Sequence, residues 1–178
     1  MSMPRIVGAA AAPALGLALA ASAFAQSPNL GKPISQEDIA SWDISIGPDG
    51  AGLPPGSGTV QQGAAVYAAK CQACHGDKGA GQPNDRLVGG QGSLSGNAPA
   101  VKTVGSYWPY ATTLFDYIRR AMPLNRSKSL ANDEVYAVTA YLLNLNGIIP
   151  DTATIDAQTL PKVTMPNREG FIAFTRGK

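Results

Sequence analysis

The sequence predicts an all-α fold, and three observations lead to that prediction. Three segments, 60–73, 113–121 and 132–146, carry apolar residues at helical spacing. No run of alternating apolar and polar residues indicates a strand. Segments rich in proline and glycine, 26–59 and 148–178, flank the helical centre. We therefore expect one helical domain over 60–147, with an irregular arm on each side of it.

Residues 1–25 have the pattern of a secretory signal peptide. Arg5 precedes an apolar, alanine-rich run, and Ala23-Phe24-Ala25 matches the A-x-A cleavage pattern. An uncleaved membrane anchor is the alternative. It is disfavoured because the run is short and contains Pro13, whereas a spanning helix needs roughly 20 strongly apolar residues. We expect cleavage after Ala25 and export to a periplasm.

The two arms, 26–59 and 148–178, are unusually long for irregular segments. In the first arm, Ser35 and Asp38 form a capping box that predicts a short helix over 35–42. Loops of such length are uncommon in compact domains unless they serve a purpose. Three alternatives stay open: wrapping around the chain's own core, docking onto a partner, and disorder.

The first central helix, 60–73, has a distinctive face. Gly63, Tyr67 and Cys71 recur at every fourth position and therefore lie along one side of the helix.

The other two central helices have clear ends. Thr113 and Asp116 form a capping box for the helix over 113–121, and Pro123 prevents its continuation. The helix over 132–146 is stopped by Gly147 and Pro150. Its apolar stripe consists of Val135, Val138, Leu142 and Leu145.

The stretch CQACH, residues 71–75, contains both cysteines and the only histidine of the chain. Two thiols on one helical turn can each add to a vinyl group of haem, and the histidine that follows can bind the iron. A thioredoxin-type pair accompanies a βαβ pattern, and a structural zinc site needs four ligands. A plain disulfide would not require the histidine. We therefore expect one haem c, attached through Cys71 and Cys74 and ligated by His75.

The second axial ligand of the iron has to be a different residue type, because no further histidine or cysteine exists. Met1 and Met3 leave with the signal peptide, so Met122 and Met165 are the candidates. Met122 follows a helix directly and precedes the last helix, and we favour it for that reason. Ligation by His and Met raises the reduction potential of haem iron, and an iron closed on both faces transfers electrons without binding oxygen.

The order of these motifs resembles a class I cytochrome c. It consists of Gly63 and Tyr67 before CQACH, then Met122-Pro123, then a helix that carries Tyr141. The resemblance covers residues 60–147. It implies the class I fold, in which the glycine and the aromatic residue of the first helix cross the aromatic residue of the last.

A narrower resemblance covers about residues 31–171. GLPPGSGT, VKTVGSYWPYATTLFDYIRRAMP, DEVYAVTAYLLNLN and MPNREGF are similar to the cytochrome subunit of sulfane dehydrogenase, SoxD. The resemblance implies a molybdenum-cofactor subunit as partner, in a heterodimer or heterotetramer that acts in thiosulfate oxidation. It also implies a c-type cytochrome as downstream electron acceptor. Similar cytochromes accompany sulfite-oxidising enzymes, so the sulfur substrate stays open, and a free soluble carrier is the alternative.

Two positions depart from the class I pattern. Asp85 stands where the family usually has the proline whose carbonyl receives the second N–H of the haem histidine. Because any residue supplies a carbonyl, we expect the hydrogen bond to survive. Ala131 stands where the last helix usually begins with Thr or Ser, so we expect Asn132 or Ser129 to cap that helix instead.

Three further residues are candidate contacts to the haem propionates. Trp108 and Tyr110 carry an N–H and an O–H that can donate to a carboxylate, and Arg119 can form an ion pair with one. Packing around the haem is the alternative role for the aromatic residues, and solvation at a helix end is the alternative for Arg119.

The charge pattern excludes other classes of function. The net charge is +2 and no basic stripe is present, so nothing favours nucleic-acid binding. After the signal peptide no apolar stretch is long enough to span a membrane. The glycine-rich loop 89–96 lacks the Gly-Lys-Ser/Thr of a phosphate-binding loop, and we interpret it as part of the haem pocket.

Overall fold

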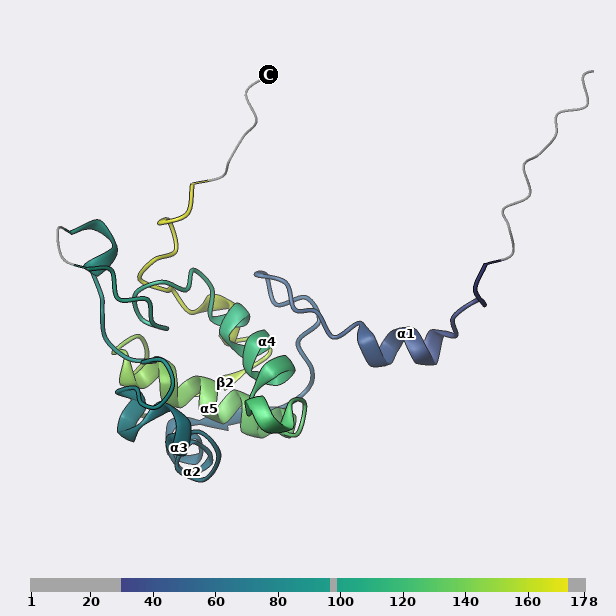
Figure 1. Cartoon of the computed structure of the whole chain (residues 1–178), viewed down its shortest axis with the longest axis horizontal. Helices are drawn as coiled ribbons and strands as arrows, with labels where there is room; N and C mark the ends of the chain where they lie inside the picture. Colours follow the sequence, from purple (N-terminus) through teal and green to yellow (C-terminus); the bar gives the residue numbers. More distant parts are fainter. Residues whose placement is uncertain (1–29, 97–98, 173–178) are drawn as a thin grey trace, which may run out of the picture.

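The computed structural model describes residues 30–96 and 99–172. The predicted signal peptide, residues 1–25, lies outside these residues. Their regular elements are the helices α1 (Gln36–Trp42), α2 (Val60–Lys70), α3 (Gln72–His75), α4 (Ala111–Ala121) and α5 (Asn132–Leu145), the strands β1 (Ser57–Thr59) and β2 (Thr154–Asp156), and four single 3₁₀ turns. The all-α prediction is confirmed, with one very small sheet added (Figure 1). No helix in the described part of the chain is long and apolar enough to cross a membrane.

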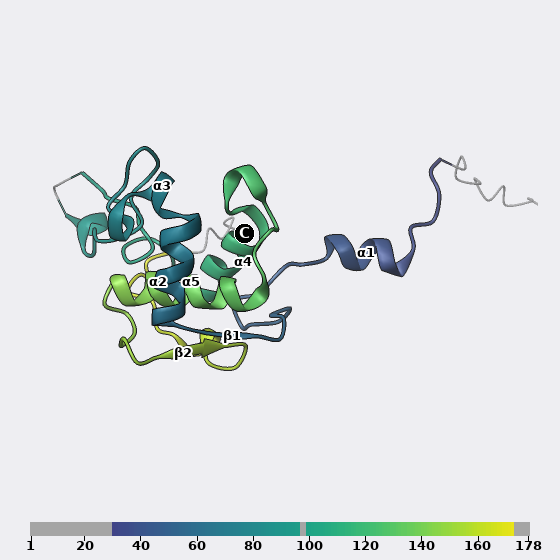
Figure 2. The ribbon, with the colours of Figure 1, turned by 90° about the horizontal axis from the view of Figure 1, so that it is seen from below.

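The crossing of α2 and α5 is the centre of the fold. Thr59 and Gln62 form a capping box that starts α2. Gly63 allows the close approach, because a Cβ added at Gly63 would collide with the carbonyl of Ala137 and lie 2.7 Å from Cβ of Tyr141. Eight residues of α5 between Val135 and Leu143 are buried. The predicted contact between Gly63 and the last helix is therefore confirmed (Figure 2).

The first central helix is shorter than predicted. It ends at Lys70 instead of Ala73, because the backbone at Cys71 leaves the helical region at φ −125° and ψ −38°. A separate turn, α3, then carries Gln72 to His75. The break means that the predicted haem-binding motif, CQACH, does not continue the axis of α2.

The start of α4 differs from the prediction. The helix begins at Ala111 with Tyr110 at the N-cap position, so Thr113 lies inside the first turn and caps nothing. Asp116 pairs with Arg120 at 2.7 Å instead. The predicted end is confirmed, because α4 stops at Ala121 and the backbone of Met122 is extended.

The start of α5 also corrects an expectation. Ala131 occupies the N-cap position, and neither Asn132 nor Ser129 caps the helix. The Asn132 amide donates to the carbonyl of Pro55, and the Glu134 carboxylate accepts the Ala131 N–H at 3.1 Å. Glu134 thus supplies one half of a capping box, and Ala131 has no side-chain acceptor to supply the half that the family gives to Thr or Ser.

The sheet was not predicted. Strands β1 and β2 pair antiparallel, with Ser57 opposite Asp156 and Thr59 opposite Thr154. The sheet lies against α5, and a side chain at Gly58 would collide with the backbone of Ala137 (Figure 2). It joins the segments before and after the helical centre.

The two flanking segments behave differently. After α5, the side chains of Ile155, Leu160 and Met165 are buried in the core. Before α2, the Tyr136 hydroxyl donates to the carbonyl of Pro54 at 2.8 Å, which holds that end of the segment on the body. Helix α1 has the predicted bounds and the predicted Ser35 cap, yet none of its residues is buried, and it projects away from the body (Figure 1).

Candidate haem site

The two cysteines and the histidine lie on one turn after α2. The N–H groups of Cys74 and His75 both donate to the carbonyl of Cys71, at 3.1 and 3.0 Å. Both thiols are free, Cys71 half-buried and Cys74 exposed. Burial raises the pKa of Cys71 to about 11, so its thiol is neutral at pH 7, unlike the low-pKa thiolates of redox sites.

One hydrogen bond orients the ring of His75. Nδ1 of His75 lies 2.9 Å from the carbonyl oxygen of Asp85. When Nδ1–H donates to that oxygen, Nε2 keeps the lone pair that binds iron. The expected bond therefore exists in this structure although Asp85 replaces the usual proline.

The loop that brings Asp85 to His75 is fixed by main-chain bonds. The Gly81 N–H donates to the carbonyl of His75 at 2.8 Å, and the Asn84 N–H donates to the carbonyl of Cys74 at 2.8 Å. Gly76 has φ +74°, a conformation that favours glycine, and a side chain there would collide with the carbonyl of Gly81.

Tyr67 connects α2, α5 and this loop. Its ring lies 5.4 Å from the ring of Tyr141, centroid to centroid, as the class I pattern implies. Its hydroxyl donates to the carbonyl of Gly76 at 2.8 Å. Burial raises the pKa of Tyr67 to about 12, so the phenol stays neutral and remains a donor.

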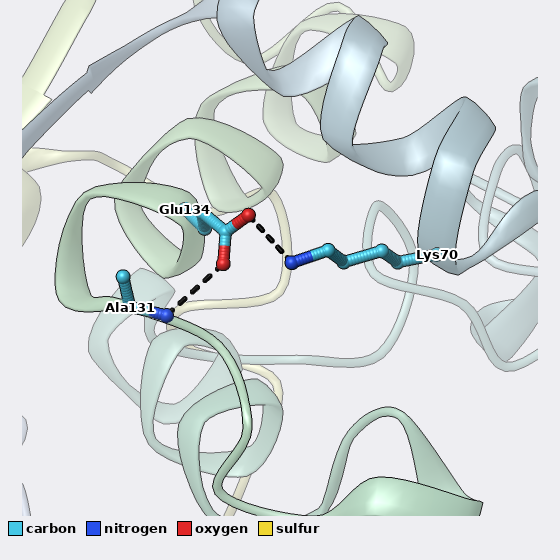
Figure 3. A network of polar contacts seen from close by, with 3 residues as sticks. All are labelled: Lys70, Ala131 and Glu134. Carbon is cyan, nitrogen blue, oxygen red and sulfur yellow. Dashed lines mark hydrogen bonds and ion pairs between the residues drawn. The ribbon is translucent and has the colours of Figure 1, made fainter.

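A polar network joins the residue before Cys71 to the start of α5. The ammonium of Lys70 lies 2.6 Å from one oxygen of Glu134, and the other oxygen accepts the Ala131 N–H (Figure 3). The Lys70 bond is the main cause that lowers the pKa of the Glu134 carboxyl. Both side chains are about a third exposed, so the pair contributes modestly to stability.

The loop that follows CQACH is attached to the end of α5 by Asn146. The buried Asn146 amide donates to the carbonyls of Leu87 and Leu142 and accepts the Gly89 N–H at 3.0 Å. This contact places the start of the predicted haem-pocket loop, 89–96, and no pattern in the sequence predicts it.

The two candidate methionines lie in different surroundings. Met122 ends α4, is half-buried and packs against the core. Met165 is 1% exposed and is part of the core itself. A ligand must present its sulfur to the cofactor, so these surroundings favour Met122, and its role remains a proposal.

The three candidate propionate residues have different neighbours. Trp108 packs edge-on against Tyr117, with ring centroids 5.6 Å apart. Tyr110 lies under the guanidinium of Arg168, which is 4.2 Å from its ring centre. Arg119 borders a small pocket beside Ile44 and is not the arginine next to Tyr110.

Arg168 is a site candidate that the sequence reasoning missed. It belongs to MPNREGF, a motif that the resemblance singled out without assigning a role to its arginine.

The donor set fits haem c. Two free thiols lie three positions apart on one turn, Nε2 of the histidine beside them is left for a metal, and a half-buried thioether follows α4. These are the attachment and ligand groups that a covalent haem requires.

Comparison with known proteins supports the assignment. The family model described as cytochrome c oxidase, cbb3-type, subunit III, matches residues 58–142. A chain in the crystal structure of the sulfane dehydrogenase SoxCD from Paracoccus pantotrophus is 44% identical, with a TM-score of 0.76, and the match covers 82% of this chain and 71% of that chain. A search of curated proteins found no match. Since this identity extends over most of both chains, and the chain carries CQACH with Nδ1 of its histidine beside a carbonyl oxygen, the chain belongs to the SoxD-like family of c-type cytochromes.

Proposed function

We propose that the chain is an exported, periplasmic cytochrome with one haem, and that it is the electron-accepting subunit of a molybdenum-containing sulfur dehydrogenase in thiosulfate oxidation. The signal peptide is residues 1–25. The observation that carries the haem assignment is the bond between His75 Nδ1 and the Asp85 carbonyl beside two free cysteines. The similarity to a chain of the sulfane dehydrogenase SoxCD supports the sulfur chemistry.

The haem supplies reversible one-electron chemistry between ferrous and ferric iron. The protein contributes attachment, orientation and exclusion of other ligands. Cys71 and Cys74 would attach the cofactor through thioether bonds, and His75 would bind the iron through Nε2. Met122 would supply a second ligand, so the site would pass electrons without binding oxygen.

The partner in this proposal is a molybdenum-cofactor subunit, SoxC-like, in a heterodimer or heterotetramer. Electrons then leave to a downstream c-type cytochrome. A free soluble carrier is the second candidate, and one observation favours it: the segment after α5 packs Leu160 and Met165 into the chain's own core.

Purification of the tagged mature protein from the periplasm of its source tests the proposal. We expect one haem per chain, measured by pyridine haemochrome absorbance, and about equal amounts of haem and molybdenum. A monomer with haem and no molybdenum contradicts the dehydrogenase assignment and supports the free carrier. A preparation without covalent haem contradicts the cytochrome assignment as well.

A further inference from the structure

The segment 30–43, here called the N-terminal extension, exposes several large apolar side chains. Leu30 is 86% exposed, Ile34 59% and Trp42 76%. Within α1, Ile39 and Trp42 are three positions apart and share a face, which Asp38 borders, whereas Glu37 lies on the other side of the helix. Leu30, Ile34 and Trp42 therefore face solvent, and Ile39 is half-buried.

Helix α1 is too short to be stable on its own. It has seven residues and no buried residue, although Ser35 caps it. Isolated helices below about 12–15 residues are marginal in water, and most helical stability comes from packing of an apolar face. A helix with these properties needs a surface to pack on.

The end of α1 lies beside the loop after Met122. The ammonium of Lys128 lies 5.3 Å from the ring centre of Trp42, which places α1 beside this loop. Leu124, two residues after Met122, is 76% exposed. A protein that covers the end of α1 therefore also meets the loop that follows the candidate haem ligand.

The comparison with SoxCD indicates what covers this surface. The match covers 82% of the chain, about 146 of its 178 residues, whereas only 135 residues run from Ile44 to the last residue. The matched region therefore begins at or before about residue 33 and includes α1. The similar chain comes from an enzyme with two components, SoxCD. The other component is therefore a candidate to cover the N-terminal extension.

We propose that the N-terminal extension, together with Leu124, is the docking surface for the molybdenum subunit. The inference rests on the proposed function and identifies the part of the chain that binds the partner. The extension carries Lys32 against Glu37, Asp38 and Asp43, a net charge of −2. The partner site is accordingly an apolar groove with basic groups at its rim.

The test compares molybdenum per haem in tagged proteins purified from the source periplasm. The variants are Ile39→Ser/Trp42→Ser and Leu124→Ser, and the control is Ile172→Ser, which changes a fully exposed apolar residue elsewhere. The molybdopterin is identified by its fluorescent oxidation product. Haem absorbance and circular dichroism establish that each variant is folded.

We expect about one molybdenum per haem in the wild type and the control, and a loss of about tenfold or more in both variants, since apolar anchors dominate protein interfaces. A retained ratio in either variant, with molybdenum present in the wild type, overturns the inference alone. A wild type without molybdenum overturns the proposed function with it. A homodimer that the Trp42 variant dissociates shows a second copy as the occupant and also overturns the inference.

Discussion

At the scale of single residues, the site depends more on main-chain groups than on side-chain identity. The oxygen that orients His75 is the carbonyl of Asp85, and the oxygen that holds Tyr67 is the carbonyl of Gly76. A proline-to-aspartate change therefore leaves the histidine bond in place. This outcome followed from the sequence, because every residue type offers the same acceptor. The stacking of Arg168 on Tyr110 did not, because it joins residues far apart in the chain.

The choice between the two methionines gives a residue-scale prediction. Met122→Ala removes the proposed thioether ligand and should lower the reduction potential and open the iron to carbon monoxide. Met165→Ala removes a core side chain and should lower the free energy of unfolding by about 2–5 kcal/mol, with no carbon monoxide binding. Absorbance of the reduced proteins under carbon monoxide and urea titrations measure both effects. Carbon monoxide binding by the Met165 variant alone would reverse the assignment.

At the scale of elements, local patterns predicted the helices, and their boundaries depended on more distant contacts. The period of α5 and the stop after Ala121 were evident in the sequence. The start of α4 was not, because its first residues, Ala111 and Thr112, are buried and the tertiary packing extends the helix past the predicted cap at Thr113. At Ala131, in contrast, the contact is local, because the Glu134 carboxylate accepts the Ala131 N–H and no side chain at Ala131 caps the helix.

Gly63→Ala tests the helix crossing. Alanine favours a helix by about 1 kcal/mol over glycine, so an isolated α2 would gain stability. At the crossing, however, the added Cβ collides with the Ala137 carbonyl, and overpacking of this kind costs about 1–3 kcal/mol or more. We expect net destabilisation in urea titrations. Ala65→Gly, at an exposed position of α2, is the control and should cost about 1 kcal/mol through propensity alone. A stabilised Gly63 variant would show that the helices do not approach so closely.

The Lys70–Glu134 pair gives a prediction on pH. The pKa of Glu134 is lowered in the folded state, so its contribution is present above the pKa of the unfolded chain and is lost as the pH falls through the folded-state value. Glu134→Gln should lower the free energy of unfolding at pH 7 by about 1 kcal/mol or less, and the difference from wild type should shrink below about pH 4. Urea titrations at both pH values measure it, with Glu37→Gln on exposed α1 as control. A loss that is larger in acid would contradict this account.

At the scale of the whole molecule, the sheet and the C-terminal segment were the least predictable features. Strands β1 and β2 have three residues each, too few to show an alternating pattern. They pair although almost the whole helical centre separates them in the sequence. Burial of Ile155, Leu160 and Met165 likewise depends on a surface formed by distant helices. Helix α1, in contrast, was predicted from its local cap alone, and it makes no core contact that could have shifted it.

Two truncations test this division of the molecule. A chain that ends at Gly147 loses β2 and three side chains that are at most 3% exposed, and each such side chain contributes about 1.5–3 kcal/mol. That sum is comparable to the whole stability of a typical domain, about 5–15 kcal/mol, so we expect this chain not to fold. A chain with the signal peptide joined directly to Ile44 loses no buried residue among those that the structure describes, and it should keep the wild-type Tm, measured by circular dichroism with haem attached. It should lose the molybdenum subunit nonetheless, because the lost residues are the proposed docking surface. A marked fall in the Tm of this second chain would mean that the N-terminal extension packs on the chain's own body, which would remove the physical reason for assigning it to a partner.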